Sequence, residues 1–202
     1  MNARFGTALL VLVIAQSLFL AAMIRDRVSL LRSDDVVTLQ TEPIDPRDLF
    51  RGDYVILNYD VSRLTLGTLG GDTAFESGDE IYVELAPGET TWNAIALWKE
   101  WREPAAGNSI LRGRVSWVLE GAPVTAEPGE GGEIERPCPE CRVANVAYGI
   151  ESYFVPEGEG RVLEDERNAG NLTVDVALGS DGEGAIKRLR LDGEPVYEEP
   201  LF

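Results

Sequence analysis

Histidine is absent from the 202 residues of this chain, and its two cysteines and two lysines are nearly as scarce. Without histidine there is no Ser-His-Asp triad, no histidine general base and no His-ligated zinc. Basic residues as a whole are few, with 18 Lys and Arg against 35 Asp and Glu, which gives a net charge of -17. Nucleic-acid binding needs cations placed against phosphates, so this balance argues against a nucleic-acid partner.

One long hydrophobic run stands near the N-terminus, where residues 5–24, FGTALLVLVIAQSLFLAAMI, carry no charge. A helix of that length spans about 30 Å, the thickness of the hydrocarbon core of a bilayer. A cleaved signal peptide begins in the same way, but its apolar core is about 7–15 residues long and ends at a small-x-small site. LAAMIRDR offers no such site. We therefore predict an uncleaved anchor in residues 1–32, with the lipid bilayer as the partner of residues 5–24, and one soluble domain in residues 33–202.

The basic residues that flank this run bear on its orientation. Arg4 lies on one side, and Arg25, Arg27 and Arg32 lie on the other. A count of basic residues favours a cytoplasmic domain. An N-terminal signal anchor in front of a large domain without a second span is, however, the usual arrangement for an exported domain, so we expect the domain to be extracytoplasmic.

Beyond residue 34 the apolar residues repeat with a period of two, which predicts strands. The predicted strands are residues 36–40, 54–61, 80–85, 90–98, 109–120, 142–150, 172–178, 185–191 and 195–199. Gly, Pro and Asp clusters such as APGE and LDGEP separate these runs as hairpin turns do. Short strands at this spacing predict a mainly β fold, an antiparallel barrel-like or sandwich domain.

Two segments depart from the strand pattern. Residues 159–170, EGRVLEDERNAG, have acidic residues near their start and a stop signal in Asn168 to Gly170, which predicts one short helix. Residues 121–137 are rich in Gly, Pro and Glu and predict an exposed, mobile loop.

The most specific local pattern is PIDPRDLFRGDYVILNY, residues 43–59. Gly52 can take a positive φ at no steric cost, and Asp53 can close a turn, so a strand is expected to begin at Tyr54. The run from Tyr54 is apolar on both faces, which predicts a central, buried strand. We interpret the motif as structural; its residues are Gly52, Asp53, Tyr54, Leu57 and Tyr59.

These five residues make GDYVILNY, which resembles the signature of the GDYXXLXY family of uncharacterised bacterial membrane-anchored proteins. YGIESYFVPEGEG (residues 148–160) is similar to a second landmark of that family, and KRLRLDGEPVYEEPLF (residues 187–202) is similar to its C-terminal end. The resemblance covers nearly the whole chain. It implies the bacterial inner membrane as the location, an integral membrane protein as partner, and no established activity. The first hypothesis is therefore a non-enzymatic accessory or interaction module.

The two cysteines, Cys138 and Cys141, form a C-x-x-C pair. Zinc would need two carboxylates in addition, because the chain has no histidine and no further cysteine. A redox pair is expected at a helix N-terminus after a strand, whereas this pair precedes a predicted strand. The pattern favours a local disulfide or inert thiols over redox activity or a metal, and we expect no metal and no cofactor.

Glu151, Glu157 and Glu159 gather where a predicted strand breaks into a Gly-rich turn. Carboxylates on such a turn could hold a divalent cation or act as an acid and base pair. They could equally cap the helix that follows, and capping is the favoured interpretation.

An enzymatic alternative comes from another resemblance. DLFRGDYVIL and AIKRLRLDGEP are similar to segments of bacterial signal peptidases, which implies Lys187 as a general base. The nucleophile is missing, because residues 34–61 contain no serine and Ser33 and Ser62 stand at the wrong distances. The second hypothesis is thus a signal-peptidase-like hydrolase with Lys187 as base.

Overall fold

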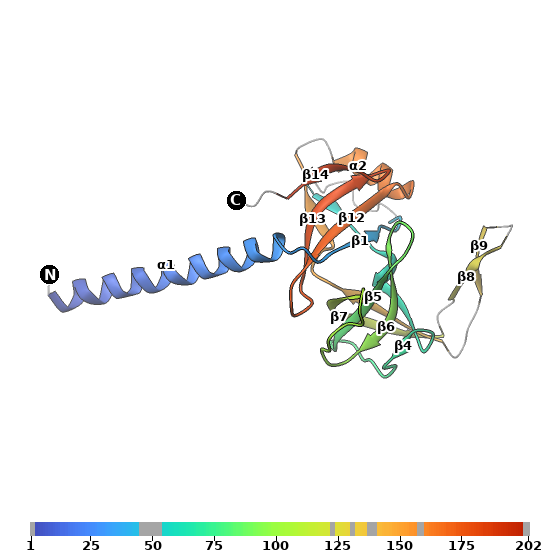
Figure 1. Ribbon diagram of the computed structural model, residues 1–202, viewed down its shortest axis with the longest axis horizontal. Coiled ribbons are helices and arrows are strands. Elements are labelled where there is room, and N and C mark those ends of the chain that lie inside the picture. The colour runs from blue at the N-terminus through green and yellow to red at the C-terminus, as the bar shows by residue number, and fades with distance from the viewer. Residues whose placement is uncertain are drawn as a thin grey trace.

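The computed structural model of the protein describes residues 3–44, 54–121, 124–129, 132–136, 141–156 and 160–199. A long helix, α1 (Ala3–Leu31), projects from a β-rich globule (Figure 1). Its segment Leu9–Leu31 is long and apolar enough to cross a membrane, and the apolar part lies clear of the globule. The predicted apolar helix is therefore confirmed, and it continues beyond the apolar run until Leu31 is buried against the globule.

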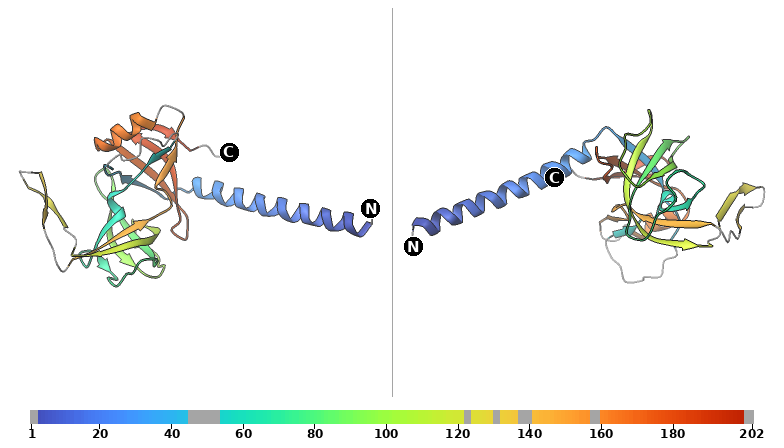
Figure 2. Two further views of the ribbon diagram at one scale, coloured as in Figure 1. Left: turned by 180° about the vertical axis from the view of Figure 1, so that it is seen from behind. Right: turned by 90° about the horizontal axis from the view of Figure 1, so that it is seen from below.

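Two main sheets build the globule. The four-stranded sheet has the order β1-β12-β13-β14 and consists of Val36–Gln40, Leu172–Leu178, Gly184–Leu191 and Glu194–Glu198. The six-stranded sheet has the order β3-β10-β7-β5-β6-β4 and consists of Arg63–Leu66, Arg142–Ala147, Ser109–Glu120, Glu80–Pro87, Trp92–Trp98 and Gly70–Gly71. It curves into a half-barrel, and all its pairings are antiparallel except that of β4 with β6 (Figures 1 and 2).

Smaller elements complete the described chain. The strands β2 (Tyr54–Ile56) and β11 (Ser152–Phe154) pair with each other, as do β8 (Val124–Gly129) and β9 (Gly132–Arg136). A short 3-10 helix, η1, covers Asp60–Ser62, and the helix α2 covers Gly160–Asn168. The mainly β fold with one short α-helix after the N-terminal helix is as predicted.

The core lies between the inner faces of the two main sheets. In β1, for example, Val37 and Leu39 are completely buried and alternate with half-buried neighbours, because successive side chains of a strand point to opposite faces. β12 is buried on both faces for most of its length, since it contacts β7, α1 and α2 in addition to its sheet neighbours β1 and β13. Side chains of β2 and η1 enter the same cluster.

The prediction of a central strand over residues 54–61 is wrong. β2 stops at Ile56 and belongs to a two-stranded sheet. Only one face of the run is buried, the face of Val55, Leu57 and Tyr59. Turn chemistry ends the strand: the Asp60 carboxylate accepts a hydrogen bond from the next backbone amide, at 2.7 Å, and the chain enters η1.

The prediction of a mobile loop over residues 121–137 is also wrong for its described part. β8 and β9 form an antiparallel hairpin there, with Ala126 opposite Ile134 and Gly129 opposite Gly132. The segment contains Val124, Thr125 and Ile134, residue types that favour strands, and this preference prevails although Gly and Glu are frequent in the segment.

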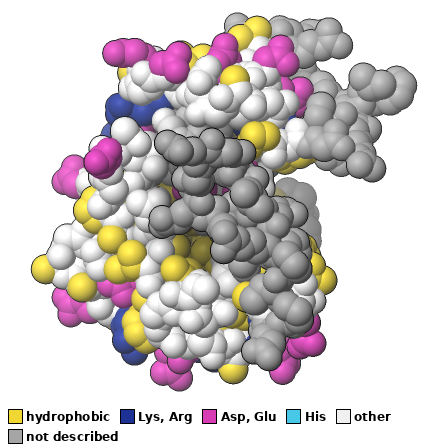
Figure 3. Space-filling view, turned by 90° about the vertical axis from the view of Figure 1, so that its right-hand side faces the viewer, with side chains coloured by type: hydrophobic (Ala, Val, Ile, Leu, Met, Phe, Trp, Pro, Cys, Tyr) yellow, Lys and Arg dark blue, Asp and Glu magenta, His cyan; other side chains and the backbone are white. Residues whose placement is uncertain are grey.

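The face of the globule opposite α1 carries acidic side chains along its margins and few basic ones (Figure 3). This distribution accords with the net charge of the chain, -17.

Candidate functional site

The signature segment and the second landmark lie side by side. β2 and β11 pair in antiparallel register, with Tyr54 opposite Phe154 and Val55 opposite Tyr153. The pairing continues past β2, since the Leu57 amide donates a hydrogen bond to the carbonyl of residue 151 at 2.9 Å. Two segments distant in the sequence thus form one ladder.

Two buried tyrosines extend this ladder in a reciprocal way. Tyr59 donates its hydroxyl to the Ile150 carbonyl at 2.7 Å, and Tyr148 donates its hydroxyl to the Val61 carbonyl at 2.5 Å. Burial raises the pKa of both phenols well above the usual value, and the charge of Glu151 adds to the effect in each. Both hydroxyls therefore stay protonated and act as donors. We call Tyr59 and Tyr148 with their two carbonyl acceptors the tyrosine lock.

Glu151 holds the turn from which the second lock tyrosine projects. Its carboxylate accepts hydrogen bonds from the backbone amides of Tyr148 and Gly149. A carboxylate that accepts two amides satisfies donors that the turn would otherwise leave unpaired. Glu157 and Glu159 lie outside the described residues, so their predicted roles in capping or cation binding stay predictions. Within the described part of the chain, no three Asp, Glu, Cys or His side chains are grouped as metal ligands.

The motif residues themselves have core positions where they are described. Leu57 and Tyr59 are almost completely buried and belong to the main cluster of core side chains. The backbone of Tyr54 pairs in β2. Gly52 and Asp53 lie outside the described residues, so the predicted turn stays a prediction. The structural interpretation of the motif thus fits its described members.

Asp60 follows the motif directly and lines a cleft of about 270 Å³ between β3 and β6. The pKa of Asp60 is raised to about 6, chiefly by burial and further by the charge of Glu42, against the lowering effect of the Val61 amide. Among the described residues no cation forms an ion pair with Asp60. Sequence analysis missed the Asp60 carboxyl group. Its position in the apolar run of residues 54–61 could have indicated a partly buried acid.

Arg167, in α2, is buried without an ion-pair partner among the described residues. It donates hydrogen bonds to the carbonyl of Ile44, before the signature segment, to the carbonyl of Ile56, within that segment, and to the Asn168 side chain. Burial lowers the pKa of this guanidinium, and nearby Glu164 partly offsets the effect. Sequence analysis missed this residue because an arginine in a polar helix is typical of a solvent-exposed face.

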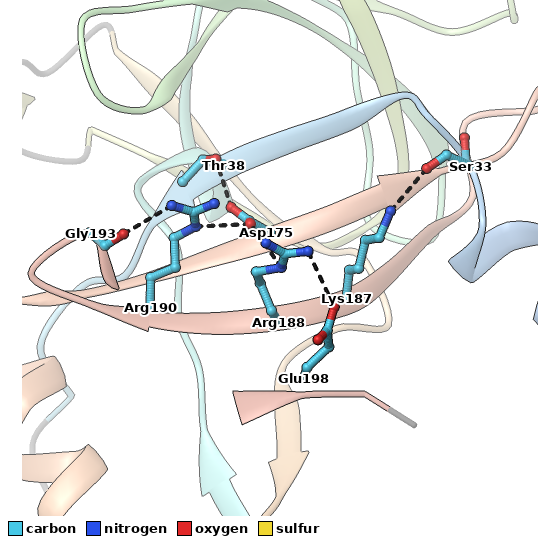
Figure 4. Close-up of polar contacts among 8 residues, drawn as sticks. All are labelled: Ser33, Thr38, Asp175, Lys187, Arg188, Arg190, Gly193 and Glu198. Atoms are coloured by element: carbon cyan, nitrogen blue, oxygen red, sulfur yellow. Dashed lines mark hydrogen bonds and ion pairs between the residues drawn. The ribbon is translucent and has the colours of Figure 1, made fainter. Parts of the chain in front are cut away.

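The third landmark begins with Lys187 in β13 (Figure 4). The register with β12 shifts here, since Arg188 lies opposite Asp175 and Ile186 lies opposite Val176, which leaves Lys187 as a bulge. The bulge interrupts the alternation that would place Lys187 on the same face as Leu189. Its ammonium donates a hydrogen bond to the backbone carbonyl of Ser33, at 3.2 Å, just beyond the end of α1.

Asp175 is the buried centre of the polar group shown in Figure 4. It accepts hydrogen bonds from Arg190 Nε at 2.9 Å and Thr38 Oγ1 at 2.8 Å, and Arg188 Nε lies 3.5 Å away. Arg188 also pairs with Glu198 of β14, at 3.2 Å. These contacts join β1, β12, β13 and β14, so the third landmark ties one sheet together.

The third landmark also touches the second. The rings of Tyr197 and Tyr153 meet edge to face with centroids 6.4 Å apart. The turn between β13 and β14 uses Asp192 at φ 48° and Gly193 at φ 82°, as two-residue hairpin turns require, so the LDGEP turn is confirmed. All three landmarks therefore form connected parts of one framework.

Cys141 precedes β10 and is engaged in a disulfide. Cys138 lies outside the described residues, so the pairing between the two stays a prediction.

Comparison with known proteins gives one match. The family model of the GDYXXLXY protein matches residues 16–189, which include the signature segment, the second landmark and the start of the third. No curated protein and no solved structure matches the chain.

Proposed function

Since the chain belongs to the GDYXXLXY family, and its landmarks bind one another, we propose that it is a non-enzymatic, membrane-anchored accessory or interaction module. Residues 1–32 are the uncleaved anchor and residues 33–202 are one β domain. The partner is an integral membrane protein of the bacterial envelope, and the domain lies on the extracytoplasmic side of the inner membrane.

The observation that carries this proposal is how α1 joins the globule. Leu31, in its last turn, is buried, and the Ser33 carbonyl accepts the Lys187 ammonium. β1 begins at Val36, so only a few residues separate the helix from the sheet. A domain attached in this way keeps a fixed position against the membrane surface, which suits contact with a neighbouring membrane protein more than reach toward distant substrates.

The polar contacts support a module over a hydrolase. Lys187 donates to a backbone carbonyl, and the Ser33 hydroxyl accepts a hydrogen bond from the Asp35 amide at 3.2 Å. A general base needs its nucleophile within hydrogen-bond reach. Among the described residues no serine hydroxyl is hydrogen-bonded to Lys187.

Two experiments test the proposal. Carbonate extraction of membranes should leave the full chain in the pellet, and release into the supernatant would contradict the anchor. A photocrosslinking residue at Leu12 of α1, compared with one at the exposed Ile95 of β6, should capture one integral membrane protein reproducibly from the α1 position. Equal capture from both positions would count against a specific partner in the membrane.

Replacement of Lys187 by Arg separates the two hypotheses, because Arg keeps a cation for the Ser33 carbonyl but cannot act as a general base. In a strain whose phenotype depends on the gene, the module predicts a normal phenotype if the variant accumulates normally. Loss of the phenotype in a variant with unchanged thermal stability would instead favour the hydrolase. Protease added to spheroplasts reports the side of the membrane on which the domain lies. It should digest an extracytoplasmic domain and leave a cytoplasmic one intact.

A further inference from the structure

A cleft of about 640 Å³ lies between the last turns of α1 and the hairpin that connects β12 with β13. Residues of α1 from Met23 onward, together with Ser33, form one wall, and residues 178–183 with the hairpin turn form the other. The hairpin lies beside the C-terminal end of α1, where the helix joins the globule (Figures 1 and 2). Ser33 is the one candidate residue discussed above that lines this cleft.

The helix wall is fixed to the globule. Leu31 is buried, and the Leu178 amide donates a hydrogen bond to the Asp35 carbonyl at 2.9 Å. Lys187 binds the Ser33 carbonyl at 3.2 Å from the other side. These bonds hold the last turn of α1 at a set distance from β12.

The hairpin wall is fixed as well, through Arg112 of β7. Its guanidinium lies 3.0 Å from Asp181 and 3.7 Å from Glu183, and its amide donates to the Gly182 carbonyl at 2.7 Å. Gly179 allows the closest approach to the helix, since an added Cβ would lie 3.3 Å from a methyl group of Leu30. The cleft is therefore preformed and does not depend on a ligand for its shape.

The position of the cleft relative to the bilayer follows from the proposed membrane anchor, so this inference rests on the proposed function. The apolar run ends at Ile24, so Met23 marks the edge of the hydrocarbon and Ser33 lies about 15 Å farther along the axis, at about 1.5 Å per residue. The headgroup layer on each side of a bilayer is about 5–7 Å thick. The cleft thus begins at the hydrocarbon edge and crosses the headgroup layer.

The chemistry of the lining combines both signs of charge. Arg27 and Asp26 line the cleft and have no ion-pair partner among the described residues. Asp181, which pairs with Arg112, stands on the opposite wall, and Ser29 and Ser180 also line the cleft. A guanidinium suits a phosphate group, and carboxylates suit a primary ammonium, which donates three hydrogen bonds.

We propose that this cleft binds the headgroup of a zwitterionic phospholipid with a primary ammonium, phosphatidylethanolamine. Arg27 contacts the phosphate, and Asp26 contacts the ammonium. A quaternary ammonium donates no hydrogen bond and is bound best by aromatic rings, and no aromatic side chain of the described chain lines the cleft. Phosphatidylglycerol has no ammonium and would leave the carboxylates facing an anion.

The test uses the full chain, purified in detergent and incubated with equimolar phosphatidylethanolamine, phosphatidylcholine and phosphatidylglycerol. Native mass spectrometry then measures the bound fraction of each lipid. Phosphatidylethanolamine should be retained preferentially, and both Arg27→Gln and Asp26→Asn should weaken its binding by about three- to tenfold. Arg25→Gln and Asp34→Asn are matched controls, since both residues lie near the same end of α1 outside the cleft, and they should bind as the wild type does.

Several outcomes would overturn the proposal. These are equal retention of the three lipids, equal effects of the test and control variants, or displacement of the lipid by equimolar glycerophosphoethanolamine, which has the headgroup without acyl chains. Carbonate extraction distinguishes the two levels of the argument. A chain that stays in the membrane without lipid preference refutes the lipid site alone, whereas a chain that is extracted refutes the anchor and the site together.

Discussion

Replacing Tyr59 with Phe removes one hydroxyl and leaves the ring in place. The Ile150 carbonyl then loses its donor at 2.7 Å in a completely buried position. A buried polar group left unsatisfied costs about 1–3 kcal/mol, so the free energy of unfolding should fall by that amount. In a protein of this size each kcal/mol lowers the melting temperature by about 2–4 °C. Tyr148→Phe should have a similar effect, because it leaves the Val61 carbonyl unpaired.

The assay is thermal and urea unfolding of the full chain in detergent at pH 7, followed by tryptophan fluorescence. Tyr82→Phe is the control, since its hydroxyl bonds the surface carboxylate of Glu80 and its loss should cost less than about 0.5 kcal/mol. The two lock hydroxyls bind the same pair of segments, so the double variant should deviate from additivity by about 0.5 kcal/mol or more. A Tyr59→Phe variant as stable as the Tyr82→Phe control would refute the idea that the motif is a structural lock.

Three further substitutions address the surroundings of the lock. The pKa of Asp60 is raised from 3.8 to about 6, so its contribution to stability is present below about pH 4 and is lost as the pH rises through 6. Relative to Asp60→Asn, the wild type should lose on the order of 1–3 kcal/mol of unfolding free energy between pH 4 and pH 7. Parallel pH profiles of the two proteins in urea unfolding would contradict this expectation. Arg167→Met leaves the carbonyls of Ile44 and Ile56 without their buried donor and should lower the unfolding free energy by about 2–4 kcal/mol. The exposed Arg114→Met should be nearly neutral, and equal urea midpoints of the two variants would refute the role of the guanidinium. At Gly113 an added Cβ would lie 2.8 Å from the ring of Tyr148, so Gly113→Ala should lower the unfolding free energy by about 1–3 kcal/mol in thermal unfolding. An added Cβ at Gly160 meets only ordinary van der Waals contacts, so Gly160→Ala is the control. Equal stability of the two variants would count against this packing.

The long strands could be predicted because their local patterns suffice. β1, β7 and β12 have the predicted bounds, since each is an apolar or alternating run. The strands β8 and β9 were missed because residues 121–137 are rich in Gly, Pro and Glu. The other missed strands, β3, β4 and β11, are four residues or shorter. Strands that short take their conformation from the partner with which they pair, and a partner distant in the sequence leaves no local signal.

The site could be predicted only in part, for the same reason. The apolar alternation around Leu57 and Tyr59 indicated buried side chains, and both are buried. Nothing near Tyr148 indicates that its hydroxyl meets the carbonyl of residue 61. The bulge at Lys187 is likewise invisible in the sequence, where the alternation of the neighbouring leucines continues without a break.

The lock also determines where the molecule should open first. A three-residue strand paired with another three-residue strand is not stable by itself, and closing the loop between segments 91 residues apart costs entropy. The pairing of β2 with β11 therefore depends on the tyrosine hydroxyls and on buried side chains such as Val55 and Leu57. In Tyr59→Phe the Leu57 amide, which bonds the carbonyl of residue 151, should lose hydrogen-exchange protection before the amides of β12 do. Uniform loss of protection across β12 and residue 57 would mean that the lock is no separate unit but only one part of the global core.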